Sequence, residues 1–472
     1  MATARSDQVR FPPGFVWGTA TAAYQIEGAG PPGSRGPSIW DTFAARPGRT
    51  ADGDNGDVAC DHYHRYPEDL QLLHALGVGA YRFSVSWARL QHAGRGPLNQ
   101  RGIDFYSRIV DGLLDRGIEP WVTLYHWDLP QPVEDAGGWP ARDTALRFAD
   151  FAAGVHHFLA DRVKRFITLN EPWCSAFLGY ASGLHAPGRT EPAAAIRATH
   201  HLLLGHGLAL EAMRSIAPAE IGITLNLAPT AAATGHPDDI EAARRVDGLH
   251  NRLYLDPLLR GHYPADVVED LGPITKFGFV ADGDLGVIHQ PIDFLGVNYY
   301  APQTVYGTPD APPVEPPSTH LGLTRLGFRQ TERRTSMGWS VEGAGLTRVL
   351  TRLARDYPPI PLYITENGAA YEDEPAGGQV LDHDRIDYLD EHLRAAHDAI
   401  AAGVDLRGYF LWSLLDNFEW AEGYRKRFGL VFVDYATQER VPKLSAKFYR
   451  DVILANGLRS TPQLRLARPP VP

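Results

Sequence analysis

The chain has 472 residues, 44% of them hydrophobic, and a formal net charge of −11 at pH 7. This charge argues against a nucleic-acid partner, because phosphates would repel an acidic surface. No apolar run approaches the roughly 18–20 residues that span a bilayer, and residues 1–10 lack the apolar core of a secretory signal. Cys60 and Cys174 are too few for a disulfide framework. We therefore expect a soluble cytoplasmic protein that binds neither membranes nor nucleic acid.

Short β-type runs alternate with helical patterns along the whole chain. Strand–helix alternation repeated eight times indicates parallel strands, and closing eight of them gives a (β/α)₈ barrel, the TIM barrel of the α/β class. No low-complexity linker divides the sequence. We expect a single domain over residues 1–472, with its core between about residues 11 and 456. The predicted strands are residues 16–21, 80–87, 121–127, 165–171, 220–227, 293–300, 362–366 and 408–414.

Two of the predicted helices have clear signals. Residues 143–163 carry apolar side chains at helical spacing after a candidate cap, Asp143, and residues 385–402 do so before Gly403. The proline-rich segment 301–340 follows the sixth strand, so we expect a structureless loop over the C-terminal mouth of the barrel. The proline-rich tail after Thr461 should pack loosely.

Two glutamates stand where predicted strands end. Glu171 lies in Thr-Leu-Asn-Glu-Pro, and Glu366 lies in Ile-Thr-Glu-Asn-Gly. The residue before a proline is kept out of the helical region, so Glu171 should stay extended, and Gly368 should allow a sharp turn. Both carboxylates should then reach the C-terminal rim of the barrel. Two carboxylates that face one bond are the minimal equipment for glycoside cleavage.

Further hydrogen-bonding and aromatic residues end or follow the same strands. Sugars are bound through many hydroxyl hydrogen bonds and through aromatic faces, and this set offers both. Each residue alone would be read as part of the core, but their joint placement beside two carboxylates favours a sugar site. The set comprises Gln25, His126, Trp127, Asn298, Tyr300, Trp412, Glu419 and Trp420.

Three competing signals are weaker. Residues 28–33 match the G-x-G-x-x-G dinucleotide fingerprint, but two prolines follow the second glycine and no helix begins there. His62 and His64 lack a third metal ligand at suitable spacing, and Cys174 is read as an ordinary reduced thiol. A catalytically silent sugar-binding module would be expected to lack one of the two glutamates, and both are present.

The ordered set of motifs resembles glycoside hydrolase family 1, the retaining β-glucosidase and β-galactosidase family, from about Phe11 to Asn456. Any one of these motifs is weak evidence, but together and in this order they are specific. The matching segments are FVWGTATAAYQIEG at residues 15–28, YRFSVSW at 81–87, LNEP at 169–172, TENG at 365–368 and WSLLDNFEW at 412–420.

The resemblance assigns a role to each matching residue. It makes Glu171 the general acid/base and Glu366 the nucleophile, with Arg82 and Tyr300 in contact with the Glu366 carboxylate. It also implies a cis Trp412–Ser413 peptide. Gln25, His126, Asn170 and Glu419 would hold the hydroxyls of the glycone with help from Trp420, Trp412 would form its platform, Trp127 and Asn298 would line the same site, and Trp173, Trp339 and Phe428 would form the aglycone side.

These roles imply an exo-acting β-glucosidase that releases terminal non-reducing β-D-glucosyl residues, with β-galactosides or β-fucosides as further substrates. Its partners would be small β-glucosides or short oligosaccharides, and it would need no metal or cofactor. Glu171, desolvated beside the negative Glu366, should have a raised pKa and carry a proton near neutrality. Retention of configuration requires carboxyl groups roughly 5–5.5 Å apart.

Overall fold

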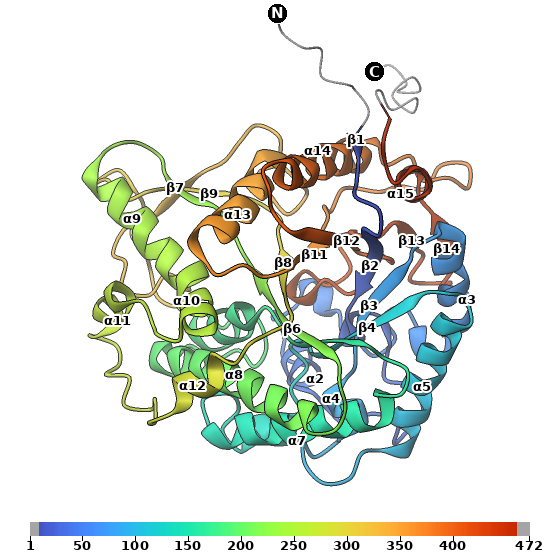
Figure 1. The fold of residues 1–472 in the computed structure, drawn as a ribbon, viewed down its shortest axis with the longest axis horizontal. Helices are drawn as coiled ribbons and strands as arrows, with labels where there is room; N and C mark the ends of the chain where they lie inside the picture. The colour runs from blue at the N-terminus through green and yellow to red at the C-terminus, as the bar shows by residue number, and fades with distance from the viewer. Residues whose placement is uncertain (1–8, 460–472) are drawn as a thin grey trace, which may run out of the picture.

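The computed structural model describes residues 9–459 and contains a closed barrel of eight parallel strands at its centre (Figure 1). Helices surround the barrel, and the first strand of the chain, β1 (Val9–Arg10), pairs with the last, β15 (Gly457–Leu458). The predicted fold is confirmed. In barrel order the strands are β2 (Val16–Thr21), β3 (Ala80–Ser84), β4 (Glu119–Tyr125), β5 (Arg165–Asn170), β6 (Glu220–Asn226), β8 (Phe294–Asn298), β11 (Leu362–Asn367) and β12 (Leu406–Trp412).

All eight predicted runs are barrel strands, and the differences lie at their ends. The prediction extended the second strand to residue 87, for example, whereas β3 ends at Ser84 and a short helix begins at Trp87. The sixth strand also ends early, at Asn298. In both places buried apolar or aromatic residues follow the strand, such as Trp87, which stacks on Phe151, so the sequence pattern continues beyond the hydrogen-bonded strand.

Glycines in the strands make room for large rings in the barrel interior. A Cβ atom at Gly222 would come within 2.6 Å of the Phe294 ring. The Trp121 ring lies 5.3 Å from that of Phe294, 4.8 Å from that of Tyr363 and 4.9 Å from that of Phe410. Trp121, Phe294 and Tyr363 lie near the N-terminal ends of their strands, and with Phe410 their rings fill that end of the barrel. The open end is therefore the C-terminal one.

Of the two predicted helices, α14 ends before Gly403, which has a φ of +93° as expected for a C-terminal glycine. The predicted cap of α7 is wrong. That helix begins at Arg142 after Ala141, and Asp143 lies inside its first turn and bonds Arg147. The α-helices are α1 (Ala23–Ile26), α2 (Ile39–Ala44), α3 (His62–Leu76), α4 (Trp87–Leu90), α5 (Gln100–Leu114), α6 (Gln131–Asp135), α7 (Arg142–Leu159), α8 (Pro192–Arg214), α9 (Pro237–Asp247), α10 (Leu253–Arg260), α11 (Ala265–Leu271), α12 (Asp284–Ile288), α13 (Gly343–Asp356), α14 (His383–Ala401) and α15 (Leu444–Ala455).

The segment 301–340 is not structureless, which corrects the prediction. It contains β9 (Gln303–Tyr306) and β10 (Gly327–Arg329), which form a three-stranded sheet with β7 (Thr230–Ala232). Strands this short between prolines have too few alternating residues to be recognised. The remaining elements are the strands β13 (Val431–Val433) and β14 (Arg440–Pro442), the 3₁₀-helices η1 (Ala51–Gly53) and η4 (Trp420–Glu422), and the π-helices η2 (Cys174–Ala181) and η3 (Gly248–Arg252).

The residues behind the weaker sequence signals have structural roles. Residues 28–33 begin no helix, and Arg89 donates to the Gly28 carbonyl oxygen at 2.8 Å. His62 bonds Asp69 at 2.7 Å within α3. Within residues 9–459 no cluster of three or more His, Cys, Asp or Glu side chains could hold a metal ion, and no helix is long and apolar enough to cross a membrane. The predicted loose tail after Thr461 lies outside the described residues.

Candidate active site

A pocket of about 490 Å³ lies at the C-terminal ends of the barrel strands. Gln25, Arg82 and Asn170 lie behind its wall and reach it through hydrogen bonds to lining residues. The segment 301–340 contributes to the lining as predicted, for example through Phe328. Of the predicted site residues, the pocket is lined by His126, Trp127, Glu171, Trp173, Asn298, Tyr300, Trp339, Glu366, Trp412, Glu419, Trp420 and Phe428.

Glu366, near the end of β11, is held by two donors, one on β3 and one just after β8. Arg82 of β3 donates from Nη1 to Oε1 at 2.6 Å, and the Tyr300 hydroxyl donates to Oε2 at 2.7 Å. Both bonds favour the charged carboxylate. Arg82 also donates to Asn170 at 2.6 Å, so its guanidinium is fixed in place. Glu366 is therefore a carboxyl group held in a fixed orientation beside a cation, an arrangement that suits a nucleophile.

Glu171 follows β5 but is not extended, which corrects the prediction. Its φ is +46°, in the left-handed region that non-glycine residues rarely occupy. Such conformations cost about 1–3 kcal/mol and cluster at functional sites, where surrounding contacts hold them. Trp127 and Trp420, which line the same pocket, have φ values of +74° and +51°. Three strained residues around one pocket mark it as the functional centre.

Within residues 9–459 no cation bonds the Glu171 carboxyl group. Asn298 donates to its Oε1 at 2.7 Å, and the Cys174 thiol donates to its Oε2 at 3.1 Å. Burial, followed by the negative charge of Glu366, raises the pKa of Glu171 to about 8, which agrees with the prediction. The two buried carboxyl groups therefore differ, since Glu171 carries a proton at neutral pH and can donate it, whereas Glu366 is bonded by the Arg82 cation.

Sequence reasoning missed the contact between Cys174 and Glu171. The thiol is free and buried, and burial and the Glu171 charge raise its pKa well above the ordinary value, so it stays protonated. It is an unreactive thiol, as predicted, but it is also a hydrogen-bond donor to the proposed acid. The available signal was the spacing, because residues three apart face each other once a helix begins.

We expect the Cys174 contact to set the alkaline limb of the pH profile. A thiol that donates to the Glu171 carboxylate stabilises its charged form and lowers its pKa. Cys174→Ala should therefore raise this pKa by about 0.5–1 unit, the size expected for a weak hydrogen bond of about 1 kcal/mol. Since Glu171 must be protonated to act as an acid, the fall of kcat/KM near pH 8 should move to higher pH. Cys174→Ser should restore the wild-type limb.

Cys60→Ala is the matched control, because the buried Cys60 thiol bonds the Asp416 carbonyl oxygen instead. Its alkaline limb should not move. A limb in Cys174→Ala that stays at the wild-type position would show that the thiol does not influence the acid.

His126 presents a free N–H donor inside the wall of the pocket. Arg82 can only donate, so the Asn170 oxygen must be the atom that accepts from it. The Asn170 amide nitrogen then donates to His126 Nε2 at 3.0 Å, which places the imidazole proton on Nδ1. Burial, then the Arg82 charge, lowers the pKa of His126 well below its ordinary value, so the ring is neutral. Nδ1 is buried and has no partner among the described residues, which leaves it available to a hydroxyl oxygen.

Gln25, on α1, supplies an acceptor beside that donor. Its amide nitrogen donates to Asn417 and to the Phe418 carbonyl oxygen, both at 2.9 Å, and lies 3.4 Å from Glu419. Its buried Oε1 has no partner within residues 9–459. Desolvation, followed by the charges of Glu366 and Glu171, raises the pKa of Glu419 to about 8. Unpaired buried donors and acceptors are costly, so this end of the pocket suits a ligand rich in hydroxyl groups.

Aromatic rings enclose the same end of the pocket. Trp412 stacks on His126 with ring centroids 5.8 Å apart, and Trp420 lies 4.6 Å from Trp127. The Trp127 indole N–H donates to the Asn170 carbonyl oxygen, so this ring offers an apolar surface. The Trp412–Ser413 peptide is cis, as predicted. Gly368 is needed for a close approach and not for a turn, since a Cβ there would collide with the Trp412 carbonyl oxygen.

The opposite end of the pocket is more apolar. Trp339 lies 5.3 Å from Tyr300 and 6.2 Å from Phe428 between ring centroids. Trp173 lies 4.7 Å from His250 of η3. Sequence reasoning missed His250, because it lies in a helical segment that is distant in the sequence from every strand end. The predicted aglycone residues therefore line the pocket together with a histidine that no motif marked.

Comparisons with known proteins agree with this geometry. Residues 7–458 match the model of glycosyl hydrolase family 1. The chain is 51% identical to thermostable beta-glucosidase B of Thermobispora bispora, covering 97% of this chain and 94% of that protein. It is also 51% identical to a bifunctional beta-D-glucosidase/beta-D-fucosidase of Bifidobacterium breve, covering 95% and 99%.

Among solved structures, the psychrophilic beta-glucosidase BglU of Micrococcus antarcticus superposes with a TM-score of 0.92 at 52% identity, covering 95% of this chain and 98% of that one. The family match spans nearly all of the barrel that carries the two carboxylates. The chain therefore belongs to glycosyl hydrolase family 1 and is a glycoside hydrolase.

Proposed function

We propose that the chain is a retaining exo-β-glucosidase in which Glu366 is the nucleophile and Glu171 the general acid/base, within one catalytic domain. The observation that carries this proposal is the contrast between the two carboxyl groups. Glu366 is bonded by Arg82 and by Tyr300, which favour its charge, whereas Glu171 has only neutral donors and a pKa raised to about 8. Environments that separate two titratable groups in this way assign acid and nucleophile.

In the first step, Glu366 attacks the anomeric carbon while the Glu171 proton passes to the leaving glycosidic oxygen. A covalent glycosyl-enzyme forms and the aglycone departs as an alcohol. Arg82 and Tyr300 hold the attacking carboxylate in a fixed position, so little reorganisation is needed. Glu171 is left as a carboxylate, which the Cys174 and Asn298 donors stabilise.

In the second step, the ionised Glu171 takes a proton from a water molecule, and the water oxygen attacks the anomeric carbon. The bond to Glu366 breaks, and the sugar leaves with its original configuration after two inversions. Glu171 is then protonated and Glu366 charged, as at the start. Both steps use the same pair of carboxyl groups, so the proposal needs no metal or cofactor.

The hydroxyl-rich end of the pocket would hold the glycone. The free N–H of His126 and the free oxygen of Gln25 offer one donor and one acceptor, and Glu419 adds a carboxyl group. Trp412 offers an apolar face for the sugar ring. The 51% sequence identity to a bifunctional β-glucosidase/β-fucosidase supports β-fucosides as additional substrates. Cellobiose is the proposed disaccharide substrate, which would give the enzyme a part in cellulose breakdown.

A panel of nitrophenyl glycosides and cellobiose at one pH tests this proposal. We expect release of nitrophenol from the β-glucoside, weaker release from the β-galactoside or β-fucoside, and none from the α-glucoside, because the latter would direct its leaving group away from Glu171. Binding without turnover of any β-glycoside would favour a sugar-binding module instead.

We also propose a cytoplasmic location. Both cysteines are free and buried in the structure, which suits a reducing compartment. Fractionation of cells with detection of the native protein tests this, and recovery in an extracellular fraction would contradict it.

A further inference from the structure

One wall of the pocket is fixed by a charged network behind it. The wall consists of Asn226, Leu227 and Ala228, at the end of β6 and directly after it, and of His250 in η3. His250 lies against Trp173, two residues after Glu171. The Asn226 amide also lies 3.7 Å from the Cys174 sulfur, which bonds Glu171. The position of this wall therefore affects the space next to the general acid, where the leaving group or an acceptor must lie.

Asn251 joins the two parts of the wall. Its amide nitrogen donates to the Ala228 carbonyl oxygen at 2.8 Å, and its oxygen accepts from the Ala228 backbone N–H at 3.2 Å. The same amide nitrogen donates to Asp247 at 2.8 Å. Because Asn251 is adjacent to His250 in η3, one amide fixes both the end of β6 and the histidine.

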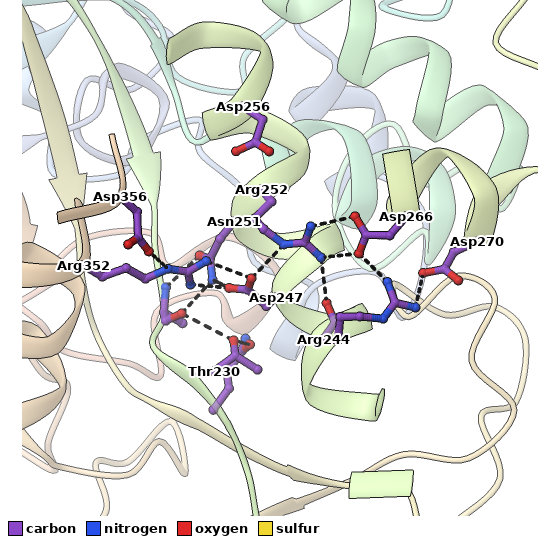
Figure 2. A network of polar contacts seen from close by, with 12 residues as sticks. Thr230, Arg244, Asp247, Asn251, Arg252, Asp256, Asp266, Asp270, Arg352 and Asp356 are labelled. Atoms are coloured by element: carbon purple, nitrogen blue, oxygen red, sulfur yellow. Dashed lines mark hydrogen bonds and ion pairs between the residues drawn. The ribbon is translucent and has the colours of Figure 1, made fainter. Parts of the chain in front are cut away.

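Asp247 is the centre of the network in Figure 2. Besides Asn251 it binds Arg352 of α13 through both carboxylate oxygens, one of these bonds being 2.9 Å long, and it accepts from Arg252 at 3.0 Å. Arg252 in turn binds Asp266 of α11 through two bonds of 2.8 and 2.7 Å. Burial, the largest single influence, opposes the charge of Asp247, but the bonds and charges of Arg352, Asn251 and Arg252 together outweigh it and keep the pKa of Asp247 below the ordinary value. Asp247 is thus an ionised carboxylate that Asn251, Arg352 and Arg252 hold from three directions.

The backbone that follows Asp247 has an unusual geometry. Asp247 ends α9, and η3 follows it as a π-helical turn that runs directly into α10. Such turns are rare in proteins, and many of those that occur lie at functional sites. Here the turn directs His250 into the pocket while Asp247, Asn251 and Arg252 face the network. The bonds among Asp247, Asn251, Arg252 and Arg352 hold this wall in place. None of them reaches Glu366 or the hydroxyl-rich end of the pocket.

We propose that Asp247 is a positioning residue that, through Asn251, fixes the Ala228–His250 wall so that a sugar can bind next to Glu171. The sugar is either the leaving group of an oligosaccharide or an acceptor that competes with water. This inference rests on the proposed function, because such competition requires a glycosyl-enzyme. We therefore expect loss of the Asp247 charge to impair sugar binding at this wall more than it impairs cleavage of the glycosidic bond.

The test is the fate of one intermediate in Asp247→Asn, a variant that keeps the shape of the side chain but removes its charge. The glycosyl-enzyme is formed from 4-nitrophenyl β-glucoside in the presence of methyl α-glucoside, and the ratio of transfer product to released glucose is measured. This ratio compares two fates of the same molecule, so the fraction of folded enzyme does not enter. We expect the ratio to fall roughly threefold to tenfold, as for other mutations that couple indirectly to a site.

Arg244→Gln is the matched control. Arg244 belongs to the same network and binds Asp270 at 2.8 Å, as well as Glu241 and Asp266, but its side chain does not contact Asp247 or Asn251 (Figure 2). Its ratio should equal that of the wild type. An unchanged ratio in Asp247→Asn, an equal fall in Arg244→Gln, or the absence of transfer by the wild type would each overturn the proposal. Failure of the proposed function would look different, since the first glucose released would then be the α-anomer.

Discussion

Glu366→Ala should abolish turnover of every β-glucoside, whatever its leaving group. Without the carboxylate that Arg82 and Tyr300 orient, no glycosyl-enzyme can form, and a good leaving group cannot replace a missing nucleophile. We expect a loss larger than the roughly 10²–10⁴-fold effect of removing a general acid. Steady-state rates with cellobiose, 4-nitrophenyl β-glucoside and 2,4-dinitrophenyl β-glucoside measure it.

Glu422→Ala is the control for Glu366→Ala, because Glu422 is another carboxylate that lines the pocket but makes no bond to Glu366. It should keep most of the turnover. The assignment of Glu366 would be wrong if Glu366→Ala kept fast turnover of the dinitrophenyl substrate, because Glu366 would then behave as a proton donor.

Glu171→Ala should give a different defect, which depends on the leaving group. Cellobiose needs a proton on the departing sugar oxygen, so its kcat/KM should fall by roughly 10²–10⁴-fold. A dinitrophenolate leaves readily as an anion, so the first step with that glucoside should slow much less. The glycosyl-enzyme should then accumulate, because no base activates water, and the product trace should show a burst.

Glu171→Gln is the matched variant for this experiment, since its amide oxygen can still accept from Asn298 but cannot deliver a proton. It should share the dependence on leaving group. Equal losses for cellobiose and the dinitrophenyl glucoside, with no burst, would contradict the role of Glu171 as the acid/base.

The eight strands could be predicted because each is a β-rich run between helical patterns, and closure into a barrel follows from that alternation. The same reasoning located Glu171 and Glu366, since each ends such a run. It failed where tertiary contacts override local preference. Glu171 precedes a proline yet has a φ of +46°, and Ala141 precedes α7 where Asp143 was expected to cap it.

The missed residues share one physical reason. Cys174 reaches Glu171 because the chain becomes helical at Pro172 and continues into η2, and His250 reaches Trp173 because η3 is a π-turn held by Asn251. Neither residue lies in a strand-end motif, and their contacts depend on how distant segments pack. The short strands β9 and β10 were missed for a related reason, because β9 is stabilised by pairing with β7 and β10 by pairing with β9 more than either is by its own sequence.

The anomeric configuration of the azide products tests the central claim most directly. Azide needs no base, so with Glu171→Ala and 2,4-dinitrophenyl β-glucoside it should attack the accumulated glycosyl-enzyme and give β-glucosyl azide. With Glu366→Ala it should attack the β-glycoside itself and give α-glucosyl azide. Proton NMR of the two products distinguishes the anomers. This account predicts β from Glu171→Ala and α from Glu366→Ala, and the reverse pair would show that the acid/base and nucleophile assignments are exchanged.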